Sequence, residues 1–89
     1  MPTRELPIVN KLGLHARAAS KFVTVASRYD ARITVTKDAR EVSGKSIMGV
    51  MMLAAARGSA IAVTAEGDDA EEALDAIEAL VADRFGEAQ

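Results

Sequence analysis

The sequence predicts an α+β fold, an open-faced two-layer sandwich with the element order β-α-β-β-α-β-α. Two patterns lead to this expectation. Segments of alternating apolar and polar residues are interleaved with stretches whose apolar residues recur at helical spacing. Residues 37–40 resemble a tight turn between two of the alternating segments, which indicates a hairpin. We therefore expect a four-stranded antiparallel sheet with three helices on one face.

The first strand and the first helix are separated by a glycine-containing loop. Residues 5–9 alternate but include Pro7, which predicts an edge strand because proline lacks a backbone N–H donor. Residues 10–14 then form a loop. Residues 16–28 have the spacing of an amphipathic helix, whose apolar positions are Ala19, Phe22, Val23 and Ala26.

The central part of the chain contains the hairpin and a second helix. Residues 31–37 and 41–43 are the expected strands of the hairpin. Ser46 suits the N-cap of the second helix, which we expect to continue through a methionine-rich segment to Arg57. Gly58 follows, where a left-handed C-terminal cap is expected.

The last part of the chain adds one strand and one helix. The strand at 60–66 has three residues expected to face inward, namely Ile61, Val63 and Ala65. Asp68 or Asp69 opens the final helix, and Glu71 and Glu72 lie at capping-box spacing from them. The buried stripe of that helix is expected to comprise Leu74, Ile77, Leu80, Val81 and Phe85.

Length and composition limit the kinds of protein and site. The 89 residues suffice for one modest core, so we expect a single domain over residues 1–89. The chain has no cysteine and one histidine, His15, so we expect no disulfide, no metal and no cofactor. No apolar run approaches the ~18 residues of a membrane span, and no hydrophobic signal core is present. We therefore expect a cytoplasmic protein that does not insert into membranes.

Charge is divided unevenly along the chain. Residues 1–60 carry ten Lys or Arg and four acids, whereas residues 61–89 carry one Arg and nine acids, for a net charge of −2. A basic segment of this kind can steer an acidic partner. Nucleic acid is not expected as that partner, because the chain has one Tyr, two Phe and no Trp for base stacking.

The residues that suggest chemistry lie where the first helix begins. His15 occupies the predicted N-cap, and Arg17 follows two residues later. Backbone N–H groups in the first turn of a helix lack partners within the helix, and the helix dipole adds positive charge there. We therefore expect the N–H groups of Ala16, Arg17 and Ala18, with the Arg17 guanidinium, to bind a phosphoryl group carried by His15.

His15 also allows other interpretations. A lone histidine at a helix start often serves only as a cap or a surface residue. No acidic residue lies near it in the sequence, and nothing pairs it with a serine nucleophile, so a hydrolytic triad is unsupported. Two further classes of function stay open at this point. One is a small regulatory or ligand-sensing module without covalent chemistry, and the other is a minimal acid–base enzyme that uses His15.

Two motifs resemble those of a known family. Residues 10–19 read Asn-Lys-Leu-Gly-Leu-His-Ala-Arg-Ala-Ala. They are similar to the active-site signature of HPr, the histidine-containing phosphocarrier of the bacterial phosphoenolpyruvate-dependent phosphotransferase system. Residues 44–53 resemble the regulatory-serine motif of that family, and the separation of 31 residues between His15 and Ser46 matches as well. One departure is Ala18, which stands where the family commonly has proline.

The resemblance implies a phosphocarrier and not an enzyme. His15 would accept on Nδ1 a phosphoryl group derived from phosphoenolpyruvate, taking it from enzyme I and passing it to enzyme IIA domains. Arg17 would stabilise the phosphate, and Ser46 would be the target of a regulatory HPr kinase/phosphorylase in those lineages that possess one. We expect a monomer that serves sugar uptake and its regulation, with the nitrogen-related regulatory branch as the alternative. Ala18 is compatible with the helix, so function should survive this departure.

The second motif also suggests how partners dock. At least one or two of its apolar residues should face solvent, and flexible Met side chains adapt to several surfaces. The residues expected to dock partners are Ser20, Lys21, Thr24, Lys45, Ile47, Met48, Met51 and Met52. The basic residues expected around His15 are Lys11, Arg17, Lys21 and Lys45. A phosphate on Ser46 would add about two negative charges beside the docking surface and weaken binding.

Overall fold

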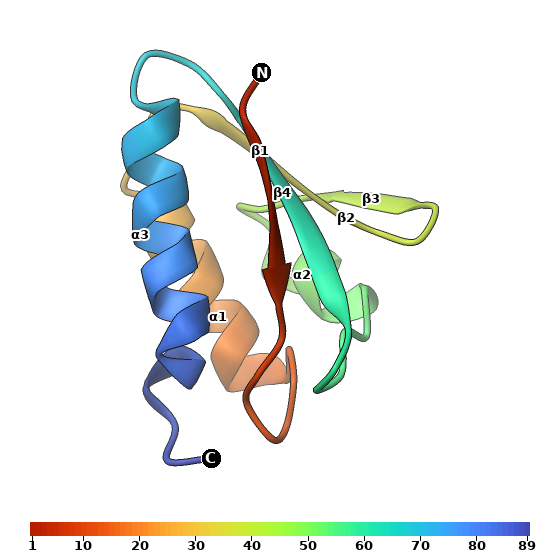
Figure 1. Cartoon of the computed structure of the whole chain (residues 1–89). Helices are drawn as coiled ribbons and strands as arrows, with labels where there is room; N and C mark the ends of the chain where they lie inside the picture. The colour runs from red at the N-terminus through yellow and green to blue at the C-terminus, as the bar shows by residue number, and fades with distance from the viewer.

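Four strands form an antiparallel sheet in the computed structural model, which describes all 89 residues (Figure 1). The strand order is β1-β4-β2-β3, so β1 and β3 are the edges. β1 (Thr3–Pro7) pairs with β4 (Ala60–Glu66), which pairs with β2 (Arg32–Lys37), which in turn pairs with β3 (Arg40–Ser43). The predicted edge strand and hairpin are confirmed, although the edge strand begins and ends two residues earlier than expected.

Three helices pack on this sheet: α1 (Ala16–Ala26), α2 (Ile47–Met52) and α3 (Ala70–Ala82). α1 and α3 lie side by side and run in opposite directions, so the start of α1 and the end of α3 are at the same end of the molecule (Figure 1). A short 3₁₀ turn, Arg84–Gly86, follows α3. None of the helices is long and apolar enough to cross a bilayer. The predicted element order and fold class are therefore confirmed.

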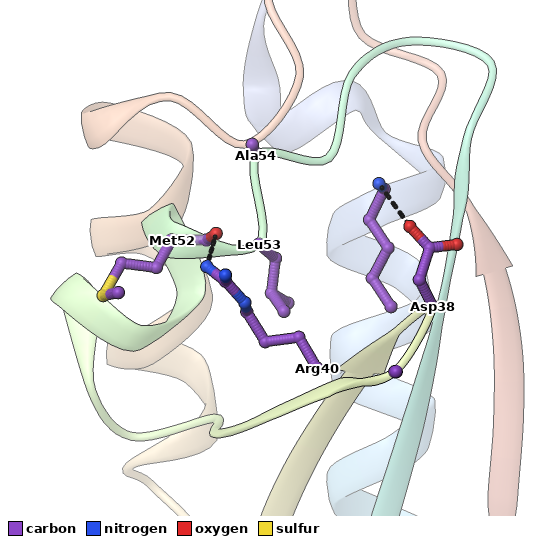
Figure 2. Close-up of a pocket in the computed structure, with 7 residues that line it drawn as sticks. Asp38, Arg40, Met52, Leu53 and Ala54 are labelled. Carbon is purple, nitrogen blue, oxygen red and sulfur yellow. Dashed lines mark hydrogen bonds and ion pairs between the residues drawn. The ribbon is translucent and has the colours of Figure 1, made fainter.

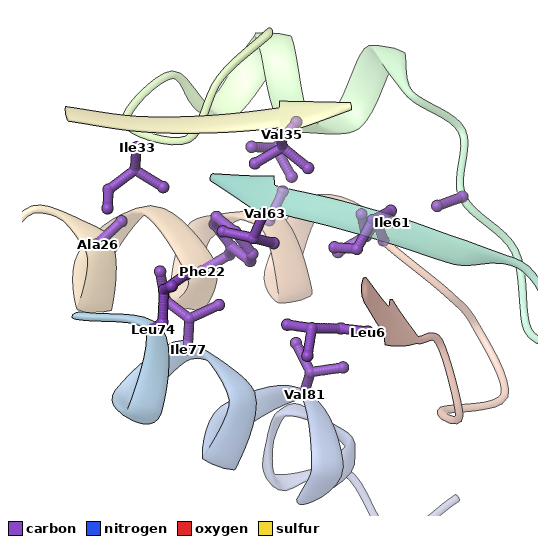
Figure 3. Packing of buried hydrophobic residues seen from close by; sticks show 14 of the residues in the cluster. Leu6, Phe22, Ala26, Ile33, Val35, Ile61, Val63, Leu74, Ile77 and Val81 are labelled. Atoms are coloured by element: carbon purple, nitrogen blue, oxygen red, sulfur yellow. The ribbon is translucent and has the colours of Figure 1, made fainter. Parts of the chain in front are cut away.

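The core lies between the sheet and the helices that cover it (Figure 3). Alternate residues of β2 and β4 point toward the helices, as period-two alternation predicts. Phe22 of α1 is wholly buried at the centre of this layer. The same buried cluster includes Leu6, Ile33, Val35, Ile61, Val63, Leu74, Ile77 and Val81. The residues expected in the buried stripe of the last helix are buried, except that Leu80 is only partly buried. Phe85 lies in the 3₁₀ turn after α3 and not in the helix, contrary to expectation.

α2 is shorter than the sequence predicts, because it ends at Met52 and not at Arg57. Ala54 adopts a left-handed conformation with φ of 51°, which turns the chain out of the helix. The turn brings Leu53 and Ala55 into the core, where both are buried. Burial of these two side chains overrides the helix propensity of the segment. Gly58 has the expected positive φ but caps no helix.

α3 begins at its predicted N-cap, Asp69, but without the expected capping box. The Asp69 carboxylate accepts hydrogen bonds from the backbone N–H groups of Asp30, at 2.9 Å, and Ala31, at 2.8 Å. Glu71 binds Arg4 of β1 at 2.9 Å. These acids therefore join α3 to other elements of the fold and do not cap their own helix.

Candidate functional site

His15 is the N-cap residue of α1, with an extended backbone at φ −72° and ψ 177°. Its side chain makes no capping hydrogen bond, and the first turn of α1 contains no acidic residue. The N–H groups at the start of α1 are therefore available to an acceptor from outside the helix. Ala16 and Arg17 are exposed there. Ala18 is wholly buried and packs in the core, so its N–H is not accessible to an outside acceptor, contrary to expectation. Alanine at position 18 is thus compatible with α1, as expected.

Gly13 holds the loop that presents His15. Its φ of +67° is left-handed, and a Cβ at this position would lie 2.4 Å from the carbonyl oxygen of Ala55. The backbone N–H of Leu14 donates to the same carbonyl at 2.9 Å, and the Leu14 side chain is buried. The loop is therefore fixed against the segment that follows α2. His15 points outward from this loop with 28% of its side chain exposed.

Sequence reasoning did not find Glu87, which contacts His15 directly. Oε2 of Glu87 lies 2.5 Å from Nε2 of His15, although 72 residues separate them in the sequence. Oε1 of Glu87 accepts a hydrogen bond from Nδ2 of Asn10 at 3.0 Å, and Asn10 is wholly buried. No local pattern marks Glu87, because it follows the last helix in an irregular segment. Only the antiparallel packing of α1 and α3 brings it to His15.

The surroundings of Glu87 favour its ionised form. Partial burial raises the pKa of the carboxyl, but hydrogen bonds from Asn10 and His15 and the charges of His15 and Lys21 lower it. The net result is a Glu87 pKa below its ordinary value. Glu87 is therefore a carboxylate at neutral pH and acts only as a hydrogen-bond acceptor.

Arg17 is free to bind an anion. Its side chain is exposed and forms no ion pair or side-chain hydrogen bond within the protein. An open hollow of about 620 Å³ lies beside it and His15. The residues that line the hollow are Lys11, Leu12, His15, Ala16, Arg17, Glu87 and Gln89. A phosphoryl group in this hollow would meet two cationic side chains and the start of α1.

Lys45 does not lie beside His15, contrary to expectation. Its Nζ donates to the carbonyl of Tyr29 at 2.7 Å, just beyond the C-terminal end of α1, whereas His15 precedes the other end. The segment after α2 returns to the loop before His15, so α2 runs antiparallel to α1 and starts at the far end. Lys21 is closer to the site, and its Nζ donates to the carbonyl of Phe85 at 2.6 Å.

Ser46 is the N-cap of α2, as predicted, and its Oγ accepts a hydrogen bond from the N–H of Gly49 at 3.1 Å. Val50 is the one buried side chain of α2. Four apolar side chains of α2 are exposed by 43%, 73%, 40% and 57%: Ile47, Met48, Met51 and Met52. We call these four residues the α2 apolar surface. The expectation that some of them face solvent is confirmed.

The other two expected docking residues, Ser20 and Thr24, are exposed on α1. Thr24 Oγ1 donates to the backbone carbonyl of Ser20 at 2.8 Å, one turn earlier. Both residues therefore lie on the same side of α1.

A second hollow, of about 680 Å³, lies between the hairpin and the end of α2 (Figure 2). Its charged side chains already have partners. Lys37 Nζ is 3.2 Å from Asp38 Oδ2, and Arg40 Nη1 donates to the carbonyl of Met52 at 2.9 Å. This hollow contains no histidine and no unpaired carboxylate, so it offers no group for phosphoryl chemistry.

Comparison with known proteins shows which family the chain resembles. Residues 2–83 match the family model described as the PTS HPr component phosphorylation site. The chain is 47% identical over 89 residues to the phosphocarrier protein HPr of Cupriavidus necator, with 100% of both chains covered. It is also 47% identical over 85 residues to the phosphocarrier protein NPr of Shewanella violacea, covering 96% of this chain and 93% of that one. The crystal structure of HPr-C-His from Thermoanaerobacter tengcongensis matches 100% of both chains with a TM-score of 0.95 and 45% identity. The chain therefore belongs to the HPr family, the phosphocarrier proteins of the phosphotransferase system.

Proposed function

We propose that His15 carries the phosphoryl group, which it takes from enzyme I and passes to an enzyme IIA domain. The observation that carries this proposal is the uncapped start of α1 beside the only histidine, with the Arg17 guanidinium free. The phosphoryl group derived from phosphoenolpyruvate is the one non-protein group that the proposal requires. Nδ1 of His15 is the proposed acceptor, because Nε2 already contacts Glu87.

Binding and charge account for most of the proposed mechanism. Phosphoryl transfer needs little covalent chemistry from a protein beyond positioning and charge stabilisation. The Arg17 guanidinium and the N–H groups of Ala16 and Arg17 would bind the phosphoryl oxygens as negative charge moves onto the site. His15 is partly exposed in a shallow hollow, so a partner's histidine has room for in-line approach.

Partner docking is proposed to involve the α2 apolar surface together with the basic residues near His15. Exposed methionines adapt to several partner surfaces, and Lys11 and Arg17 supply positive charge at the reacting end. Ser46 follows Lys45, whose Nζ reaches the carbonyl of Tyr29 just beyond the C-terminal end of α1, whereas His15 precedes the other end. The 11 residues of α1 span about 16 Å. Phosphorylation of Ser46 by a kinase/phosphorylase would therefore act on docking and not on the reacting nitrogen.

We propose sugar uptake and its regulation as the branch that this carrier serves, with no stable self-association. The similarity to NPr keeps the nitrogen-related branch as a second candidate. The deciding experiment offers the phosphorylated protein to purified enzyme IIA domains of each branch and measures which one removes the phosphoryl group. Faster transfer to the nitrogen-branch domain would replace the sugar-branch proposal.

Labelling with phosphate tests the central proposal. The protein is incubated with phosphoenolpyruvate, enzyme I and Mg²⁺, and we expect one acid-labile, base-stable phosphate per chain. His15→Ala should remove all labelling by this route. Ser27→Ala changes an exposed residue at the other end of α1 and should be labelled like the parent protein. A His15→Ala variant that is still labelled would show that another residue carries the phosphoryl group.

A further inference from the structure

The contact with Glu87 distinguishes the two nitrogens of the His15 ring. A neutral imidazole has one N–H donor and one lone-pair acceptor. The Glu87 carboxylate lies 2.5 Å from Nε2 and can only accept a hydrogen bond. Nε2 must therefore be the protonated nitrogen, and the lone pair is on Nδ1.

Asn10 determines how Glu87 is oriented. Nδ2 of Asn10 donates to the carbonyl of Gly13 at 2.8 Å and to Oε1 of Glu87 at 3.0 Å. Because a carbonyl only accepts, the amide nitrogen of Asn10, and not its oxygen, has to face Gly13. Asn10 is the one wholly buried polar side chain, and its Oδ1 has no partner. Its buried amide therefore acts as a donor to the loop and to Glu87.

Backbone contacts on both sides of Glu87 hold it in place. Lys21 Nζ donates to the carbonyl of Phe85 at 2.6 Å, and the N–H of Lys11 donates to the carbonyl of Gln89 at 3.1 Å. The Glu87 side chain is 13% exposed. The Glu87 carboxylate is therefore held in a fixed position within the site.

We propose that Glu87 and Asn10 are positioning residues that hold the proton of His15 on Nε2 and so present the Nδ1 lone pair to the incoming phosphoryl group. This proposal rests on the proposed function of His15 as the phosphoryl carrier. Neither residue contacts the phosphoryl group; Glu87 acts through the ring, and Asn10 acts through Glu87.

The same contact supports transfer in both directions. When Nδ1 attacks phosphorus, the Nδ1–P bond forms and the bond between phosphorus and the donor's nitrogen breaks, leaving its electron pair on the donor. Nε2 keeps its proton, so the ring gains a positive charge that the Glu87 carboxylate offsets. In the onward transfer, the Nδ1–P bond breaks and its electron pair returns to Nδ1. The ring then leaves as a neutral imidazole, because Nε2 is still protonated.

Replacing Glu87 with glutamine gives a sharp test, because the amide has one acceptor oxygen and one NH₂ donor. Asn10 presents an N–H donor, so the oxygen of Gln should face Asn10 and its NH₂ should face Nε2 of His15. An NH₂ group stabilises a lone pair on Nε2, which moves the ring proton to Nδ1 and blocks the acceptor. Glu87→Ala removes the contact without imposing the wrong tautomer. The isosteric variant should therefore be more impaired than the truncated one.

Two measurements are made on the parent protein, Glu87→Gln, Glu87→Ala and Glu72→Gln. The last is a matched control, because Glu72 is an exposed residue of α3 without hydrogen bonds or ion pairs. ¹⁵N NMR of the single histidine locates the ring proton, and a single-turnover assay follows phosphoryl transfer from phosphorylated enzyme I. We expect the proton on Nε2 in the parent and the control, and on Nδ1 in Glu87→Gln. Transfer should slow by at least about tenfold in Glu87→Gln and by less in Glu87→Ala.

The order of the two variants separates positioning from a structural role. A structural role would favour Glu87→Gln, which keeps the side-chain volume, over Glu87→Ala. Parent-like transfer by Glu87→Gln, or a ring proton that stays on Nε2 in this variant, would overturn the proposal. If the parent protein accepts no phosphoryl group on His15, the proposed function fails. The NMR comparison would then still decide whether Glu87 fixes the tautomer.

Discussion

Replacing Gly13 with alanine should destabilise the protein and displace its phosphorylation site together. Gly13 has a φ of +67°, and a left-handed conformation costs an L-residue about 1–2 kcal/mol. The new Cβ would also lie 2.4 Å from the carbonyl oxygen of Ala55 and 3.0 Å from the Cα of Ala56. Both neighbours are backbone atoms, so the loop has to move, and overpacking of this kind costs about 1–3 kcal/mol.

The two effects together predict a loss of about 2–5 kcal/mol in the free energy of unfolding, measured by urea denaturation. Gly58→Ala is the matched control, because Gly58 also has a positive φ, of +92°, but nothing lies within 4 Å of its added Cβ. Gly58→Ala should therefore show the backbone strain alone. The difference between the two variants measures the contact with Ala55. If Gly13→Ala is as stable as Gly58→Ala, the close approach of the loop to that carbonyl is not what requires glycine.

Gly13→Ala should impair phosphoryl acceptance as well as stability. The loop carries both the Leu14 N–H bond to Ala55 and the Gly13 carbonyl that accepts from Asn10. A shift of the loop would therefore disturb the contacts that orient His15. We expect slower phosphoryl acceptance in Gly13→Ala even where the variant is fully folded, and parent-like acceptance in Gly58→Ala.

Three further predictions concern other positions. Ala54→Gly should raise the free energy of unfolding by about 1 kcal/mol. Ala54 has a φ of 51° and an exposed side chain, so the relief of backbone strain outweighs the added freedom of the unfolded chain. An unchanged or lower thermal midpoint would argue against backbone strain at Ala54. Ser46→Asp should keep the cap of α2, so its free energy of unfolding should stay within about 1 kcal/mol of the parent's. Its acceptance of the phosphoryl group from enzyme I should slow, because the added negative charge lies beside the α2 apolar surface. Acceptance as fast as the parent's would contradict the proposal that partners dock on this surface. Glu87 has a pKa below its ordinary value of 4.5, so its contribution to stability is fully present above that value and is lost as pH falls through the lowered pKa. Urea denaturation of the parent and Glu87→Ala should therefore differ at neutral pH and converge in acid, and a constant difference would count against the lowered pKa.

The sequence predicted correctly wherever a feature depends on neighbouring residues. The strand over Ala60–Glu66 has its predicted bounds, and its buried faces follow the predicted alternation. Ser46 caps α2 through the N–H three residues later, a contact that needs no other part of the fold. His15 begins α1 for the same reason, because N-cap position is a local property.

Sequence prediction went wrong where a distant segment competes with a local preference. Helix-forming residues continue past Met52, yet burial of Leu53 and Ala55 forces Ala54 into a left-handed turn. The Asp69 carboxylate suits a helix cap, yet it binds backbone N–H groups from the loop after α1. In each case the packing of several elements outweighs a preference worth about 1 kcal/mol.

By itself, the sequence determined the alternation of strands and helices, the position of His15 at a helix start and the exposed methionines beside Ser46. These features follow from hydrophobic periodicity and capping within a few consecutive residues. Only the tertiary structure decided that Glu87 contacts His15 and that Lys45 lies away from it. Both outcomes depend on the directions in which α2 and α3 pack against α1, and that choice is made by core contacts between residues far apart in the chain.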